Sequence, residues 1–110
     1  MKWHTINSVH DIEAIIDRSH VVPCLILKHS TRCSISSMAK SRVVMSWDFS
    51  DDQVEAYYLY LIAYRDVSNY ISNEFGVPHQ SPQALLIENG KCTYDASHLN
   101  IRVSDLKQAS

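Results

Sequence analysis

The chain has 110 residues, of which 45% are hydrophobic and 20% are charged, and its formal net charge is −2. This length and balance predict one globular domain over residues 1–110 and argue against a disordered chain. The lysines and arginines are dispersed and form no basic stripe that could hold phosphates, so we expect no nucleic-acid partner.

The start of the sequence lacks the apolar core of a signal peptide, and no segment approaches the roughly 18 apolar residues that a membrane span requires. Three cysteines at uneven spacing do not form a disulfide framework. We therefore expect a cytoplasmic protein without membrane association, whose cysteines serve in packing or in chemistry.

The first third of the chain predicts two strands with a helix between them. Residues 3–6 have a strand pattern, and residues 8–11 resemble a capping box ahead of three isoleucines at helical spacing, Ile12, Ile15 and Ile16. The next strand, over residues 21–27, is short and apolar. Pro23 lies near its start, where a missing ladder donor costs least.

A second helix and a third strand follow. Apolar residues recur every four positions and predict a helix that ends near Trp47, with a stripe made of Ile35, Ala39, Val43 and Trp47. Residues 48–52 read as a loop. Residues 54–63 are almost uniformly apolar and aromatic, as expected of a central strand covered on both faces, so we expect their tyrosines to pack in the core.

The last part of the chain predicts a third helix, a hairpin and a short fourth helix. The third helix carries the stripe Val67, Tyr70, Ile71 and Phe75, and it ends at Gly76, which can take a left-handed cap. Asn89-Gly90 favours a type I′ turn between strands at 84–87 and 91–94, and a helix fits around Val103 and Leu106. The order βαβαβαββα predicts an α/β fold, with a parallel sheet core, a C-terminal antiparallel hairpin and helices on both faces.

Cys33 falls where the second strand turns into the second helix, and no second cysteine lies three residues on. Backbone N–H groups and the dipole of a helix N-terminus stabilise an anion by roughly 0.3–2 kcal/mol, and the neighbouring Arg32 acts in the same direction. Both effects lower the pKa of a thiol. The pattern predicts a monothiol redox nucleophile, and the alternative is a small apolar cysteine at a helix start.

The other two cysteines are expected to be structural. Cys24 lies nine residues before Cys33, mostly along a strand, which implies a separation of roughly 20 Å, and Cys92 lies at the far end of a neighbouring strand, on the order of 15 Å away. A disulfide needs Cα atoms closer than about 7 Å. Neither residue should reach Cys33, so any mixed disulfide must be resolved by another molecule.

Six histidines invite a metal interpretation, but the chain has no C-x2-C or H-x3-H pair, so we expect no metal site. The chain also shows no signature of a Cys-His hydrolase, which needs an orienting group and an oxyanion hole. His29 lies close to the strand end before Cys33. It either tunes the thiol as a base or hydrogen-bond partner, or is only a polar residue at the sheet edge.

Residues 76–91, Gly-Val-Pro-His-Gln-Ser-Pro-Gln-Ala-Leu-Leu-Ile-Glu-Asn-Gly-Lys, are similar to the thioredoxin segment that comprises a helix end, a loop, a cis-proline, a strand and an Asn-Gly hairpin. The resemblance implies a thioredoxin-like fold with the cis bond before Pro82. In thioredoxin-like proteins the residue before this proline offers its backbone N–H and C=O to an extended substrate. Ser81 and Pro82 are therefore expected to dock substrate.

More narrowly, residues 28–36 (Lys-His-Ser-Thr-Arg-Cys-Ser-Ile-Ser), 65–71 and 81–84 resemble the monothiol bacilliredoxins, and the likeness spans nearly the whole chain. That family carries a Thr-Cys-Pro-Ile-Ser type motif. Here Arg32 separates Thr31 from Cys33, and Ser34 stands where the family has proline. Because proline at that helix position is preorganised and lacks an N–H, Ser34 adds a donor and loosens the turn, which affects rate and potential more than the chemistry.

The resemblance implies a thiol-disulfide oxidoreductase that removes bacillithiol, or a similar small thiol, from protein mixed disulfides. Cys33 would carry the small thiol and be regenerated by a second one, which serves as co-substrate; no tightly bound cofactor is implied. Ser36 takes the place of a resolving cysteine, and its hydroxyl can bond the thiolate. Thr31 and Arg32 line the same turn and are expected to contact carboxylates of the small thiol, since arginine pairs well with carboxylate.

Two other functions remain open at the level of the sequence. Cys33 could ligate an iron–sulfur cluster or a metal, as in monothiol glutaredoxins with their similar Cys-x-x-Ser loop, although those proteins have glycine where this chain has Ser34. Alternatively, the domain is a thioredoxin-like interaction module with an inert thiol. Only the redox function predicts S-thiolated proteins and a small thiol as partners.

Overall fold

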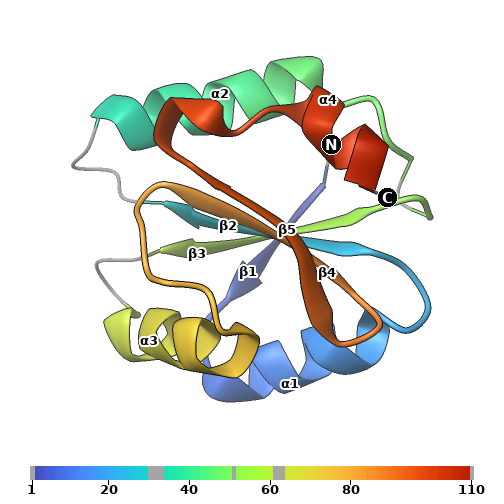
Figure 1. The fold of residues 1–110 in the computed structure, drawn as a ribbon, viewed down its shortest axis with the longest axis vertical. Helices are drawn as coiled ribbons and strands as arrows, with labels where there is room; N and C mark the ends of the chain where they lie inside the picture. Colours follow the sequence, from blue (N-terminus) through green and yellow to red (C-terminus); the bar gives the residue numbers. More distant parts are fainter. Residues whose placement is uncertain (1, 30–33, 51, 61–63, 110) are drawn as a thin grey trace.

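The computed structural model describes residues 2–29, 34–50, 52–60 and 64–109. The described residues form an α/β fold whose element order confirms the predicted βαβαβαββα (Figure 1). The elements are β1 (Trp3–Ile6), α1 (Val9–Arg18), β2 (Cys24–His29), α2 (Ser34–Ser46), β3 (Glu55–Tyr60), α3 (Arg65–Phe75), β4 (Gln83–Glu88), β5 (Lys91–Ser97) and α4 (Val103–Ala109). A short 3-10 helix, His98–Asn100, was not predicted.

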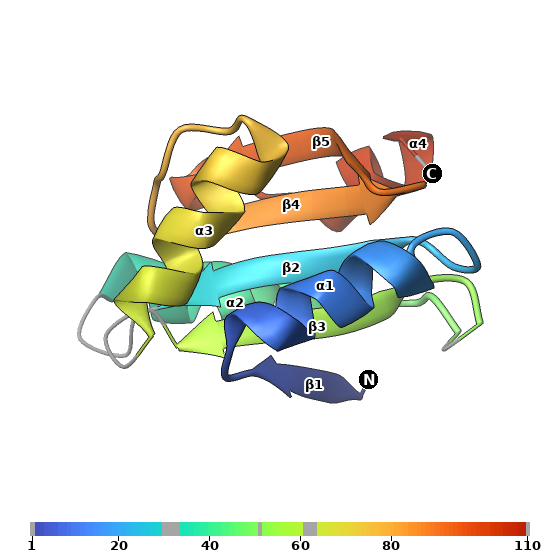
Figure 2. The ribbon, with the colours of Figure 1, turned by 90° about the horizontal axis from the view of Figure 1, so that it is seen from below.

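The strands form one mixed sheet in the order β1-β3-β2-β4-β5. β1, β3 and β2 run parallel, whereas β4 is antiparallel to both β2 and β5. Helices α1 and α3 cover one face of the sheet, and α2 and α4 cover the other (Figures 1 and 2). The predicted parallel core with a closing antiparallel hairpin is confirmed.

The aromatic strand β3 is an interior strand with a core cluster on each face, as predicted, and β2 is covered still more fully. All six residues of Cys24–His29 are buried, whereas β3 has two buried and four half-buried positions. The physical reason is position: β2 lies at the centre of the sheet, while β3 has the short strand β1 as its outer neighbour. The tyrosines still pack inward, with Tyr57 against one core cluster and Tyr58 against the other.

Two apolar clusters hold the layers together, one on each face of the sheet. The first joins the sheet to α1 and α3 and includes Ile12, Ile26 and Ile71; the second joins it to α2 and α4 and includes Leu25 and Val43. Successive side chains of a strand point to opposite faces. Along β2 this alternation sends Ile26 and Lys28 toward α3, and Leu27 and His29 toward α2.

Local signals fix the ends of several elements. The Asp11 carboxylate accepts the backbone N–H groups of Asn7 (2.7 Å) and Ser8 (3.1 Å), which caps α1. Asn89 and Gly90 have φ of 52° and 78°, as a type I′ turn requires, and Gly76 ends α3 with φ of 67°. In the part of the chain that the structure describes, no helix has the length and apolar character to cross a bilayer.

Candidate functional site

The register between two central strands defines the candidate site. Lys28, the second-last residue of β2, pairs with Gln83, the first residue of β4. Because the two strands are antiparallel, Pro82 lies beside the carboxyl end of β2, close to His29. The chain therefore leaves β2 for α2 at the same edge of the sheet where it enters β4.

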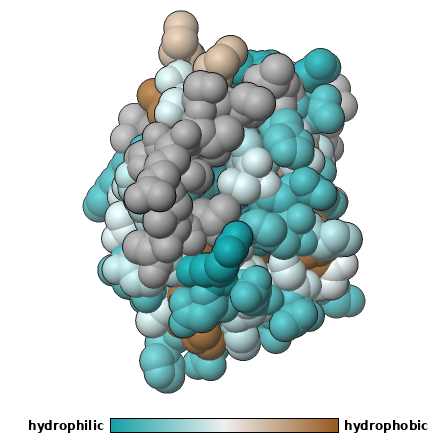
Figure 3. All heavy atoms as spheres, turned by 90° about the vertical axis from the view of Figure 1, so that its left-hand side faces the viewer, coloured by the Kyte–Doolittle hydropathy of each residue, from teal (hydrophilic) through white to brown (hydrophobic). Residues whose placement is uncertain are grey.

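The predicted nucleophile, Cys33, follows β2 in the sequence but lies outside the described residues. Thr31, Arg32 and Cys33 belong to residues 30–33, which the structure does not describe, so their roles stay predictions. Ser34 and Ser36 lie in the first turn of α2. The described surface on this side of the molecule is largely hydrophilic (Figure 3).

Pro82 is buried, and the Ser81–Pro82 peptide bond is cis. The Pro82 carbonyl accepts the backbone N–H of His98 at 2.9 Å. Ser81 is half-buried, and none of the described residues forms a hydrogen bond with its backbone. Among the described residues the N–H and C=O of Ser81 thus have no competing partner, and its role in docking an extended chain stays a prediction.

The loop before Pro82 is held by a buried glutamine. Gln83 is 1% exposed; its side-chain amide nitrogen donates to the Pro78 carbonyl at 3.0 Å, and its Oε1 accepts the Gln80 N–H at 3.4 Å. Both bonds satisfy buried polar atoms of Gln83, as burial demands. They fix residues 78–80 against the first residue of β4.

Lys28 is the most unusual residue of the site, because its side chain is completely buried. Its Nζ lies 3.3 Å from Nδ1 of His79, and 3.5 Å from both the Ser68 carbonyl and the Ser72 hydroxyl. Burial lowers the pKa of Lys28 to about 8. No carboxylate of the described residues forms an ion pair with it. The contact joins residues far apart in the chain and was not predicted from the sequence.

His29, on the opposite face of β2, is buried and not an exposed polar residue at the sheet edge. Its ring makes edge contacts with Tyr58 and Tyr60, and its Nδ1 has no hydrogen-bond partner among the described residues. Burial and then the charge of Lys40 lower the pKa of His29. The imidazole is therefore neutral at pH 7, a state in which it can accept a proton or a hydrogen bond.

A cavity of about 460 Å³ opens beside this histidine. It is lined by His29 and by five residues of α2: Ser37, Lys40, Ser41, Val44 and Met45. Lys40 also places its ammonium 4.2 Å from the centre of the Tyr58 ring, a cation–π distance. Residues 37–45 of α2 thus flank a hollow beside His29.

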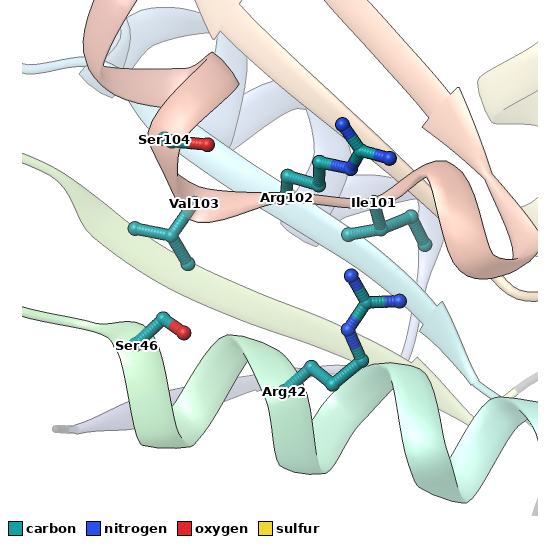
Figure 4. A pocket seen from close by; sticks show the side chains of 6 residues that line it. All are labelled: Arg42, Ser46, Ile101, Arg102, Val103 and Ser104. Carbon is teal, nitrogen blue, oxygen red and sulfur yellow. The ribbon is translucent and has the colours of Figure 1, made fainter.

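A second cavity, of about 320 Å³, lies between the later turns of α2 and the segment that leads into α4 (Figure 4). Its lining comprises Arg42, Ser46, Ile101, Arg102, Val103 and Ser104. Arg42 reaches from α2 toward Ile101 in this view. Neither Pro82 nor His29 lines this cavity, so it is separate from the candidate site.

The two described cysteines lie away from the site, as predicted. Cys24 begins β2 and Cys92 lies in β5, and both neighbour Ile87 of β4, at the opposite end of the sheet from Pro82. Cys24 is fully buried and Cys92 half-buried. Burial raises their pKa values to about 12 and about 11, so both are protonated thiols at neutral pH.

Comparison with known proteins agrees with this geometry. The family model described as "Monothiol bacilliredoxin BrxC" matches residues 4–106. A solved structure of a thioredoxin-fold protein, described as an inferred oxidoreductase, is 32% identical; the match covers 97% of this chain and 92% of that one, with a TM-score of 0.81.

Two thioredoxins show the same fold at lower identity. One, a mutant thioredoxin from Halobacterium salinarum NRC-1, is 13% identical over 97% of this chain and 86% of its own, with a TM-score of 0.70. The other, thioredoxin O2 from Arabidopsis thaliana, is 14% identical over 96% and 89%, with a TM-score of 0.68. The predicted thioredoxin-like fold is confirmed.

Proposed function

The chain belongs to the monothiol bacilliredoxin family, and from this premise we propose that it is a thiol-disulfide oxidoreductase with Cys33 as its one active cysteine. Its substrates are proteins that carry bacillithiol, or a similar small thiol, in a mixed disulfide. It acts in the reducing cytoplasm and needs no tightly bound cofactor.

The proposed reaction has two exchange steps. The Cys33 thiolate attacks the sulfur of the small thiol, a new S–S bond forms, and the substrate protein leaves as a thiolate that takes a proton from water. The thiolate of a second small thiol then attacks the mixed disulfide on Cys33. This step releases a small-thiol disulfide and restores the Cys33 thiolate, so one free small thiol is oxidised for each mixed disulfide reduced.

The observation that carries the proposal is the register of β2 against β4. It brings Ser81, whose backbone N–H and C=O form no hydrogen bond with another described residue, to the edge where the chain passes from β2 into α2. A substrate strand that pairs with Ser81 would present its disulfide to the first turn of α2. Amide groups at a helix N-terminus stabilise a thiolate attacking there.

The remaining residues of the turn have supporting roles in this proposal. Thr31 and Arg32 contact the carboxylates of the small thiol, and the hydroxyl of Ser36 bonds the Cys33 sulfur. Ser34 supplies one more backbone N–H than the family's proline would. A neutral His29 accepts the thiol proton as the thiolate forms.

An assay that measures the removal of bacillithiol from a protein tests the function. A protein carrying one bacillithiol mixed disulfide is incubated with the enzyme and excess bacillithiol, and release of the modification is followed by mass. We expect turnover with the wild type and with the matched control Cys92→Ser, and no turnover with Cys33→Ser. Equal turnover by Cys33→Ser and the wild type would refute the assignment.

A further inference from the structure

Lys28 is buried completely, although an ammonium is costly to remove from water and is normally buried only beside a compensating charge. Its neighbours among the described residues are instead three uncharged acceptors, from two elements that are far from β2 in sequence. Ser68 and Ser72 lie one turn apart on α3, and His79 lies in the loop between α3 and β4. Lys28 thus connects the end of β2 to the loop that leads to Pro82.

The contact assigns the protonation state of His79. An ammonium only donates hydrogen bonds, so Nδ1 of His79, 3.3 Å from Nζ of Lys28, must carry a lone pair. The Ser68 hydroxyl lies 3.1 Å from the same nitrogen and can donate to it as well. His79 is therefore a neutral imidazole with its proton on Nε2.

The charges around His79 favour this neutral state. Burial, Lys28 of β2 and Arg65 of α3 all lower the pKa of His79, in that order of size. The Ser68 hydroxyl on α3, which also contacts Nδ1 of His79, is uncharged. Protonation would place a second donor against the Lys28 ammonium and break the contact.

His79 precedes Ser81 by two residues in a loop that Gln83 holds from the side of β4. We infer that Lys28 and His79 are positioning residues: together they hold the Ser81 backbone in the conformation that docks a protein substrate and release it when His79 is protonated. This inference deepens the proposed function, because it rests on the docking role of Ser81. Docking should therefore weaken as pH falls through the pKa of His79, which lies below the ordinary value of 6.5.

Three variants distinguish a role of Lys28 and His79 in positioning Ser81 from a role in the stability of the protein alone. Lys28→Met keeps the length of the side chain but removes the donor. His79→Asn keeps an acceptor near the position of Nδ1 but does not titrate, and His79→Ala removes the acceptor. Lys91→Met is the matched control, since Lys91 is exposed beside the hairpin turn at the opposite end of β4. Circular dichroism establishes that each variant is folded.

The kinetic arm measures KM and kcat for a protein carrying one bacillithiol mixed disulfide, and turnover of a small bacillithiol mixed disulfide, between pH 5 and 8. We expect Lys28→Met and His79→Ala to raise KM for the protein about five- to tenfold at pH 7.5, with kcat and small-disulfide turnover changed less than twofold. In the wild type KM should rise toward pH 5. His79→Asn should keep the low KM and lose that rise.

The structural arm follows the Ser81 amide by NMR over the same pH range and does not depend on activity. Its resonance should titrate with His79 in the wild type and stay constant in His79→Asn. A wild type with this titration but no turnover would refute the proposed function and keep only the coupling of His79 to the Ser81 backbone. Three results would overturn the inference and leave the proposed function standing. They are turnover with a KM that does not depend on pH, a KM that Lys28→Met and His79→Ala leave unchanged, and a Ser81 amide resonance that titrates equally in His79→Asn and the wild type.

Discussion

Lys28 and Gln83 are direct partners in the antiparallel ladder between β2 and β4, and their side chains hold one loop from two positions. Lys28 contacts His79, while Gln83 bonds to Pro78 and Gln80. Opposite residues of an antiparallel pair lie on the same face of the sheet, so one register sets both contacts. The loop that leads to Pro82 therefore depends on a single strand pairing.

Removing the Gln83 amide should destabilise the protein. Gln83→Met keeps the volume of the side chain but leaves the Pro78 carbonyl and the Gln80 N–H without their partner. We expect the free energy of unfolding to fall by about 1–3 kcal/mol, as for the loss of two part-buried hydrogen bonds that contribute roughly 0.5–1.5 kcal/mol each. Urea denaturation measures the change, and Gln80→Met, at an exposed position and with its backbone N–H unchanged, is the control that should change it by less than about 0.5 kcal/mol. Equal effects of the two substitutions would contradict the role of Gln83.

Lys28 should reduce stability at neutral pH. Burial lowers its pKa from 10.5 to about 8, so the unfolded chain binds more protons between these values, and the cost of the buried charge is complete below pH 8. Lys28→Met should raise the free energy of unfolding at pH 7 by on the order of 1–3 kcal/mol, and the gain should shrink as pH rises from 8 to 10.5. Urea titrations at pH 7 and pH 10 measure this. A Met variant that is less stable than the wild type at pH 7 would contradict it.

The two structural thiols should be unreactive at neutral pH. Burial raises the pKa of Cys24 to about 12 and that of Cys92 to about 11, so the thiolate fraction of both is negligible. In a Cys33→Ser variant, alkylation by iodoacetamide at pH 7.5 should be at least about tenfold slower than that of a free cysteine with a pKa of about 8.5. Peptide mapping by mass spectrometry identifies the labelled residue. Rapid labelling of Cys92 at pH 7.5 would show that its burial does not protect it.

The glycine that ends α3 should resist substitution for reasons of backbone conformation alone. Gly76 has φ of 67° and nothing within 4 Å of the position a Cβ would occupy, so Gly76→Ala meets no steric clash. We expect a loss of about 1 kcal/mol, which reflects the left-handed conformation. Gly76→Asn should cost less, because asparagine tolerates this region. Thermal unfolding of both variants tests this order. A Gly76→Ala variant as stable as the wild type would exclude strain at the cap.

The elements that the sequence predicts well are those set by neighbours along the chain. The Asn89-Gly90 turn, the Gly76 cap and the stripes of α1 and α3 each depend on residues within a few positions of one another. The burial of Lys28 was not predictable in this way. Its contact with His79 spans 51 residues and exists only once β2, α3 and β4 have packed.

The same distinction applies to the sheet. The aromatic composition of residues 55–60 predicts an interior strand, which β3 is, but composition does not give the order in which strands pair, and that order places β2 at the centre. For the candidate site, the family resemblance supplied Ser81 and Pro82, and the register of β2 and β4 brought them to the predicted edge. The burial of His29 could not be predicted from nearby residues, since a histidine at a strand end is as compatible with exposure as with burial.

The central claim is that Cys33 alone carries the small thiol during turnover, and acid quenching of the reaction followed by intact mass and peptide mapping tests it most directly. We predict one small-thiol adduct per wild-type molecule, mapped to Cys33, and none on Cys33→Ser. An adduct on Cys24 or Cys92 of the quenched wild type, or equal modification of the two proteins, would contradict it.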